Sequence, residues 1–199
     1  MGRVEFDILG EPPTPEGTWV HEAAYVSAAA LRRGLDPHEL AARVPGARVL
    51  PGGLIRIVVE VPGELLNGAF EHIEDQGWPD LPRTWDNPGF VVRYAAARAA
   101  NAQRWARELG VASEPFVPRL LDGPWDRKLL RVLAELPGRR ASRDPGWPAY
   151  LVRLATAYHD AHENAPAHPK GDEEPSELHT ARLWLAQAVQ KVLPVTKQV

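Results

Sequence analysis

Hydrophobic and polar positions in the second half of the chain follow a helical period. From Asn87 to Gly110, apolar or uncharged residues recur at positions 87, 91, 94, 102, 105 and 109. Because an α-helix makes one turn every 3.6 residues, these side chains fall on one stripe. Asn87 followed by Pro88 is typical of a helix start, and Gly110 of a helix end. We therefore predict one long helix over residues 87–110.

Three more helices are predicted after it. The second starts after "DGP" and ends at "PGRR", the third opens with Asp144 and Pro145, and the fourth is capped by Ser176 after the polar loop "NAPAHPKGDEEPS". Their apolar stripes are, in order, Trp125, Leu129, Val132, Leu133 and Leu136; Trp147, Leu151, Leu154, Tyr158 and His162; and Leu178, Ala181, Leu185, Ala188 and Val192. Four amphipathic helices predict a helical bundle over residues 87–199.

The first 76 residues have a mixed pattern. "HEAAYVSAAALRRGLD", from His21, predicts a helix that ends near Gly34, and Asp36 with Pro37 opens a second helix. Two candidate strands, 47–50 and 54–61, flank "PGG", which predicts a hairpin or a tight connection between them, and "PGELLNGAFEHIEDQG" predicts a further short helix. The expected fold is mostly α, with a small N-terminal α/β appendage over 1–76, a linker over 77–86 and the bundle after it.

Composition narrows the class of protein. The chain has 199 residues, of which 44% are hydrophobic, and no cysteine. No stretch approaches the ~20 apolar residues that a membrane-spanning helix needs, and the first residues lack the apolar run of a signal peptide. The absence of cysteine excludes disulfides and thiolate chemistry. We expect a cytoplasmic protein that does not contact a membrane.

Charge is distributed unevenly. The net charge is −3, but residues 93–143 carry eleven basic and five acidic side chains, a local charge of +6. A basic patch of this kind attracts polyanions whatever the overall charge. The alternative is that these arginines pair with acids nearby.

The predicted long helix carries arginines on two faces. Arg93, Arg104 and Arg107 lie within about 60° of one another, whereas Arg98 falls among the apolar positions. Charge for phosphates and flat rings for stacking are the tools with which proteins bind unpaired RNA bases. The alternative is a core helix whose Arg98 forms a salt bridge or extends to solvent.

Catalytic and metal sites have little support. His159 and His162, beside Asp160 and Glu163, are the one cluster that resembles a metal site, but no further ligand is specified, and we favour histidines at the solvated end of a helix. The sequence has no serine elbow and no phosphate-binding loop. We predict no catalytic residue, no metal and no cofactor.

Four segments together resemble one family. "NPGFVVRYAAARAANAQRWARELG" resembles the opening helix of the anticodon-binding domain of arginyl-tRNA synthetases, the DALR family. The matching residues are Asn87, Pro88, Phe90, Val92, Tyr94, Ala95, Ala97 and Arg98. "DRKLLRVLAELPGRRA", "YLVRLATAYHDAHENAP" and "ELHTARLWLAQAVQKVL" are similar to later segments of the same domain, in the same order.

The resemblance also marks what differs from a synthetase. Residues 1–76 are faintly similar to the small N-terminal domain of these enzymes, but neither a "HIGH" nor a "KMSKS" motif occurs, and "WPDLPRTWD" stands where a catalytic domain would be. Arg93 replaces the usual glutamine, Ala96 a histidine and His162 an aromatic residue, and the tail reads "LPVTKQV". We expect no activation of arginine by this chain.

The resemblance implies a free-standing, non-catalytic tRNA-binding protein, with an arginine isoacceptor as the candidate tRNA. Tyr94, Arg98, Tyr158 and His162 would lie near the anticodon stem-loop, and Arg93, Arg104 and Arg107 would meet phosphates. One alternative is a protein-interaction module that docks on a synthetase or on another enzyme that uses tRNA. The other is a subunit that complements a separate catalytic chain.

Overall fold

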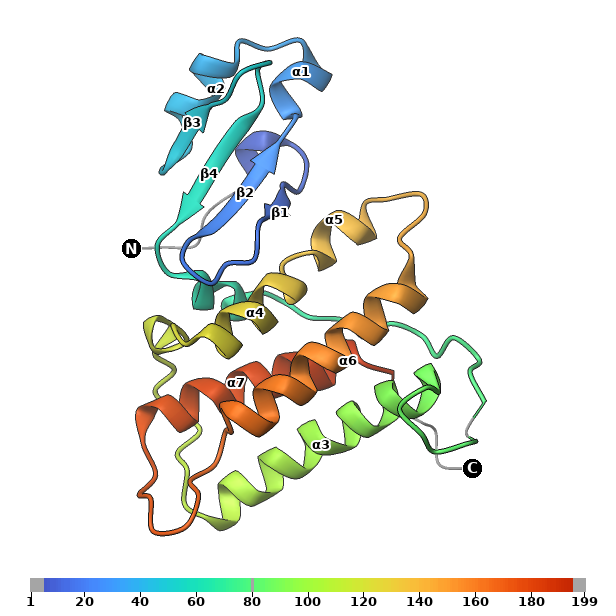
Figure 1. Cartoon of the computed structure of the whole chain (residues 1–199). Helices are drawn as coiled ribbons and strands as arrows, with labels where there is room; N and C mark the ends of the chain where they lie inside the picture. Colours follow the sequence, from blue (N-terminus) through green and yellow to red (C-terminus); the bar gives the residue numbers. More distant parts are fainter. Residues whose placement is uncertain (1–5, 80, 195–199) are drawn as a thin grey trace.

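The computed structural model describes residues 6–79 and 81–194 and confirms a mostly α protein with a small N-terminal α/β part (Figure 1). The long helices are α3 (Pro88–Glu108), α4 (Pro124–Leu133), α6 (Trp147–Asn164) and α7 (Glu177–Val192). The short ones are α1 (Ala29–Arg33), α2 (Pro37–Ala42) and α5 (Leu136–Arg140). Among the described residues, none of these helices has the length and apolar character needed to cross a bilayer.

The α/β part is an antiparallel sheet with two short helices. Its strands are β1 (Thr14–Glu16), β2 (Ala23–Ser27), β3 (Ala47–Val49) and β4 (Ile55–Val59), in the order β1-β2-β4-β3. One 3-10 turn, Phe6–Leu9, precedes the sheet and another, Pro62–Asn67, follows it. A small core joins helices and sheet: Leu9, Ala29, Ala30, Leu40, Ala41, Val44, Ile55 and Ile57.

The helix predicted from His21 is wrong in its first half. Residues Ala23–Ser27 form β2, the inner strand that pairs with β1 and β4, and only Ala29–Arg33 is helical. Because β2 is buried on both faces, its sequence shows no alternation of apolar and polar residues and cannot be told from a buried helix by period. The hairpin of β3 and β4 and the helix capped by Asp36 are confirmed. The helix predicted after residue 62 is also wrong beyond the 3-10 turn, since residues 68–79 form neither helix nor strand.

The four long helices form the predicted bundle. Asn87 caps α3, since its side-chain oxygen accepts a hydrogen bond of 2.9 Å from the Gly89 backbone N–H. The side-chain amide of Asn87 donates to the Pro79 and Pro82 carbonyls, so the same residue fastens the preceding segment to the helix. "PGRR" does not end α4 as predicted but lies within α5, and α6 begins at Trp147.

The α/β part and the bundle share one core. Trp19 and Tyr25, from the N-terminal part, belong to the same buried cluster as Leu133 of α4. Two arginines of α4 add polar contacts, because Arg131 donates to the Gly17 carbonyl at 2.9 Å and Arg127 to the Trp19 carbonyl at 3.3 Å. Helix α4 therefore lies between the two parts (Figure 1). A division at residues 76 and 87 stays a prediction.

A buried ion pair joins α4 to α7. Asp126 is almost fully buried, and its two carboxylate oxygens lie 3.2 and 3.3 Å from Nε and Nη2 of Arg182. Burial raises the pKa of Asp126, while the charge of Arg182 opposes that shift. The carboxylate therefore depends on its guanidinium partner.

We predict that Asp126→Ala destabilises the protein by ~3 kcal/mol, because it leaves the guanidinium of Arg182 without its buried counter-charge. Urea unfolding followed by circular dichroism measures the change. Asp172→Ala, which removes an exposed carboxylate from the loop before α7, should shift stability by less than ~0.5 kcal/mol. Equal effects of the two substitutions would contradict a stabilising role for the pair.

Candidate nucleic-acid interface

The predicted site residues come mostly from α3 and α6, which pack against each other along the bundle (Figure 1). Tyr94, Arg98 and Trp105 come from α3, and His159 and His162 from α6. We call the surface along this contact the α3–α6 seam. Aromatic rings and one guanidinium follow each other along it.

Arg98 ties the two helices together. Its Nη2 lies 2.7 Å from Oε1 of Glu163, and its Cζ lies 4.6 Å from the ring centroid of Tyr94. The Arg98 side chain is 19% exposed, so most of its surface is covered by the protein. The salt bridge that the sequence left open as an alternative is therefore present, and it links α3 to α6.

His159 is a buried part of this contact. Its Nε2 lies 3.0 Å from the Val91 carbonyl, and its Nδ1 lies 3.5 Å from Nη1 of Arg98. Since the carbonyl can only accept, Nε2 carries the hydrogen and Nδ1 faces Arg98 as an acceptor. Burial, with a smaller effect of Arg98, lowers the pKa of His159. The sequence interpretation of a solvated histidine is wrong for His159, and the described residues contain no group of three or more ligands suited to a metal.

Trp85 forms an exposed aromatic surface at the end of the seam where α3 begins. This side chain is 61% exposed, and its ring centroid lies 5.9 Å from that of Tyr94 and 5.0 Å from that of His159. A pocket of about 460 Å³ opens beside it. The lining residues are Trp85, Val91, Arg98, Val152, Thr156, His159, Asp160 and Glu163. Sequence reasoning missed Trp85, although a tryptophan in a polar linker was a signal available to it.

Trp105 forms a second aromatic surface further along. Its side chain is 37% exposed, and its ring centroid lies 5.3 Å from that of His168 and 6.4 Å from that of His162. Burial lowers the pKa of His162 to about 4, and the charge of Arg98 adds to that effect. Both histidine rings are therefore uncharged near neutral pH, since burial also lowers the pKa of His168. Neutral flat rings are suited to stacking.

The other predicted residues occupy different places. Arg93 donates from Nη2 to the Trp78 carbonyl at 2.7 Å and lies 3.4 Å from Asp75, so it holds the incoming segment against α3. Arg104 and Arg107 are exposed on either side of Trp105, and Tyr158 is buried beneath the seam. The structure thus brings Tyr94, Arg98 and His162 to the seam, and it separates Arg93 from them.

His162 makes stability depend on pH. Its folded pKa of about 4 is lower than the ordinary 6.5, so between these values the unfolded chain binds a proton that the folded chain does not. Stability present above pH 6.5 is therefore lost as pH falls to about 4. We predict that His162→Gln reduces the acid-induced fall in Tm between pH 7 and 4.5 by about 2–4 °C. His21→Gln, at an exposed position, is the control, and identical pH profiles for all three proteins would contradict the prediction.

Comparison with known proteins connects this chain to a tRNA enzyme. The sequence is 41% identical to arginine–tRNA ligase of Clavibacter sepedonicus over 116 residues, and 40% identical to arginine–tRNA ligase of Kineococcus radiotolerans over 117 residues. Each match covers 56% of this chain and 21% of the ligase, so the chain spans about a fifth of the length of these relatives.

No family model matches the sequence, and no solved structure matches it. The similarity to two ligases shows that the chain is related to part of an arginyl-tRNA synthetase. Membership of the DALR family in particular stays a prediction.

Proposed function

We propose that this chain binds tRNA without aminoacylating it, through the α3–α6 seam. The observation that carries the proposal is the pair of exposed tryptophans, Trp85 and Trp105, one near each end of a seam that also holds Arg98. Unpaired bases of a tRNA loop would stack on these rings, and stacking is worth ~1–3 kcal/mol per base. The similarity to arginine–tRNA ligases supports tRNA as the polyanion, with an arginine isoacceptor as first candidate.

Charge next to the rings fits the same ligand. Arg104 and Arg107 are exposed beside Trp105, and the contact of Arg104 with Glu108 is long, at 3.9 Å. A loose surface pair of this kind exchanges readily for a phosphate, since it contributes little in water. Arg98, which lies over the ring of Tyr94, would meet the nucleic acid with the exposed part of its side chain. Arg93 and Tyr158 would not contact the nucleic acid, and they would instead hold α3 and α6 in position.

The proposal includes no chemical step. The seam offers uncharged histidines, aromatic rings and guanidiniums, which are groups for stacking and for phosphate contact. The matched region is about a fifth of the ligase. We therefore propose binding alone as the role of the seam.

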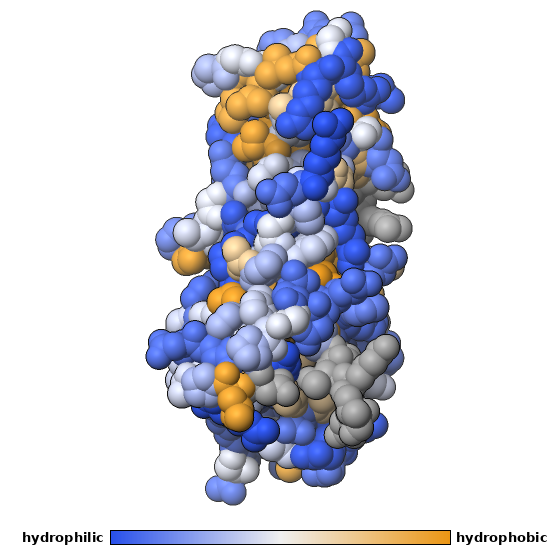
Figure 2. Space-filling view, turned by 90° about the vertical axis from the view of Figure 1, so that its right-hand side faces the viewer, coloured by the Kyte–Doolittle hydropathy of each residue, from blue (hydrophilic) through white to orange (hydrophobic). Residues whose placement is uncertain are grey.

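A second candidate, docking on a protein partner, has one observation in its favour. Leu31 and Leu35, in and just after α1, are exposed, and Figure 2 shows apolar residues gathered at the α/β end of the molecule. Contiguous exposed apolar surface is typical of protein contact sites. Recovery of one stoichiometric protein without RNA from the native host would favour this candidate over tRNA binding.

We predict different effects for charge and ring variants on tRNA binding. Arg104→Gln/Arg107→Gln should lower the slope of log Kd against log salt concentration by about 2, because two phosphate contacts are lost. Trp105→Ala should weaken binding about tenfold with the slope unchanged, because stacking releases no counter-ions. Fluorescence anisotropy with a labelled arginine tRNA measures both quantities.

Matched controls accompany these variants. Trp105→Phe retains a flat ring and should restore most of the affinity, and Arg43→Gln, on the exposed surface of the α/β part, should leave both affinity and slope unchanged. If the wild-type chain does not bind tRNA at low salt, the proposed function is wrong.

A further inference from the structure

A second basic site lies outside the seam, where the α/β part meets α4, α5 and α6. It is a pocket of about 760 Å³, which we call the junction pocket. Its charged lining residues are Arg32, Arg131, Arg139, Arg153, Glu11, Glu135 and Asp144. Glu11 pairs with Arg32 at 2.6 Å, and the carboxylate of Asp144 accepts from the Gly146 backbone N–H, so the lining as a whole has a formal charge of +1 and its positive charge lies around Glu135.

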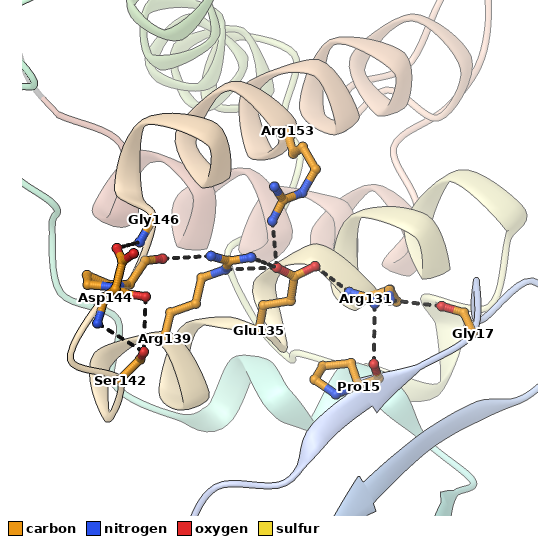
Figure 3. A network of polar contacts seen from close by, with 10 residues as sticks. Pro15, Gly17, Arg131, Glu135, Arg139, Ser142, Asp144, Gly146 and Arg153 are labelled. Carbon is orange, nitrogen blue, oxygen red and sulfur yellow. Dashed lines mark hydrogen bonds and ion pairs between the residues drawn. The ribbon is translucent and has the colours of Figure 1, made fainter.

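Three guanidiniums converge on the single carboxylate of Glu135 (Figure 3). Arg139 and Arg153 each place Nη2 2.7 Å from Oε2, and Arg131 bonds Oε1. They come from α4, the following α5 and α6, so they approach from different sides. This cluster of four residues carries a formal charge of +2.

Neutral partners hold two of these guanidiniums in place. Arg131 donates to the Gly17 carbonyl at 2.9 Å and to the Pro15 carbonyl at 3.3 Å, and Arg139 donates to the Pro145 carbonyl at 2.6 Å. A carbonyl fixes the position of a guanidinium without cancelling its charge. The positive charge of the cluster is therefore ordered in advance and only partly neutralised, which is what a preformed anion site requires.

The three arginines of the cluster are more exposed than the carboxylate that they share. The side chain of Glu135 is 15% exposed, whereas those of Arg131, Arg139 and Arg153 are 24%, 26% and 45% exposed. Burial alone raises the pKa of Glu135, but Arg139 and Arg153 outweigh it and bring that pKa below its usual value. Glu135 is thus an ionised carboxylate that orders the cluster from beneath.

Arg153 has the most donors left for a ligand. Within the part of the chain that the structure describes, its only hydrogen bond is the one from Nη2 to Glu135. Arg153 lines the pocket, and its side chain is the most exposed of the three. Ser142 also lines the pocket, but its hydroxyl already donates to the Asp144 carbonyl at 3.0 Å.

We propose that the junction pocket binds a phosphate group, with Arg153 as the main donor and Arg131 and Arg139 as fixed charges beside it. A planar carboxylate is satisfied by one guanidinium fork, whereas a tetrahedral phosphate accepts bonds in several directions, as donors from three helices supply. The volume exceeds that of a lone phosphate, so the group is part of a larger molecule. Its source is either a nucleic-acid backbone or a small phosphorylated compound.

The test is a titration of the ¹⁵N-labelled full chain with inorganic phosphate at constant ionic strength, balanced with sodium chloride. We expect saturable shifts of the arginine Nε–H signals and of the amides of Gly138 and Ser142. Arg153→Gln should weaken phosphate binding about tenfold, because one charge-assisted contact is lost. Arg119→Gln, an exposed arginine outside the pocket, should change the affinity by less than about twofold.

Three outcomes would overturn the proposal: no saturable shift, shifts confined to residues outside the pocket, or equal phosphate affinity of Arg153→Gln and wild type. The first two outcomes are measured on the wild-type chain, so they test the proposal even if Arg153→Gln fails to fold. Arg153→Lys retains the charge but not the fork, so its affinity should fall between those of wild type and Arg153→Gln.

Two further probes separate the sources. Binding of adenosine monophosphate that is tighter than that of inorganic phosphate, and weakened by Arg153→Gln, identifies a small phosphorylated compound. A salt slope for an RNA stem-loop that falls by about 1 in Arg153→Gln identifies a backbone phosphate. The phosphate titration does not involve Trp105 or the seam, so the junction pocket and the proposed tRNA binding can fail independently.

Discussion

Helix α4 has partners on both sides, and the placement of the N-terminal part on the bundle depends on that double contact. Its apolar side enters the core of the bundle through Leu129, Leu130 and Leu133, and Asp126 ties it to α7. Its arginines reach the carbonyls of the N-terminal part. Because a carbonyl cannot titrate, this second set of contacts persists over a wide range of pH. The sheet is therefore held at a fixed place on the helices.

The seam and the junction pocket use arginine in opposite ways. At the seam, Arg98 lies over the ring of Tyr94 and pairs with one acid, Glu163, so its charge is largely neutralised within the protein. At the junction, three guanidiniums share Glu135, and neutral carbonyls hold two of them, Arg131 and Arg139. The first arrangement connects helices and the second retains positive charge. The basic residues of this protein thus serve two purposes: some connect helices, and others keep a positive charge that an anion can contact.

Much of the helical half could be predicted from sequence because its elements are capped and periodic. Asn87 and Pro88 fix the start of α3 through local chemistry alone. The strand around Tyr25 was missed because its identity comes from pairing with β1 and β4, which are contacts with residues distant along the chain. Arg93 was expected to face phosphates because of its angular position on the helix. That position does not reveal that the segment around Trp78 folds against Arg93. Trp85 was missed because its neighbours Tyr94 and His159 are assembled only by folding.

The pairing of Arg98 with Glu163 has a consequence for selectivity. In the free protein the exposed carboxylate of Glu163 already occupies the guanidinium, so an anion that approaches this edge exchanges with a resident group and does not enter a vacant one. The free energy gained on binding is then only the difference between the interaction of Arg98 with the incoming anion and its interaction with the Glu163 carboxylate. Chloride, which is a weaker acceptor, gains nothing from the exchange, whereas a group with more charge and more oxygens does. Competition from Glu163 therefore disfavours the binding of chloride to Arg98 more than the binding of a phosphate group.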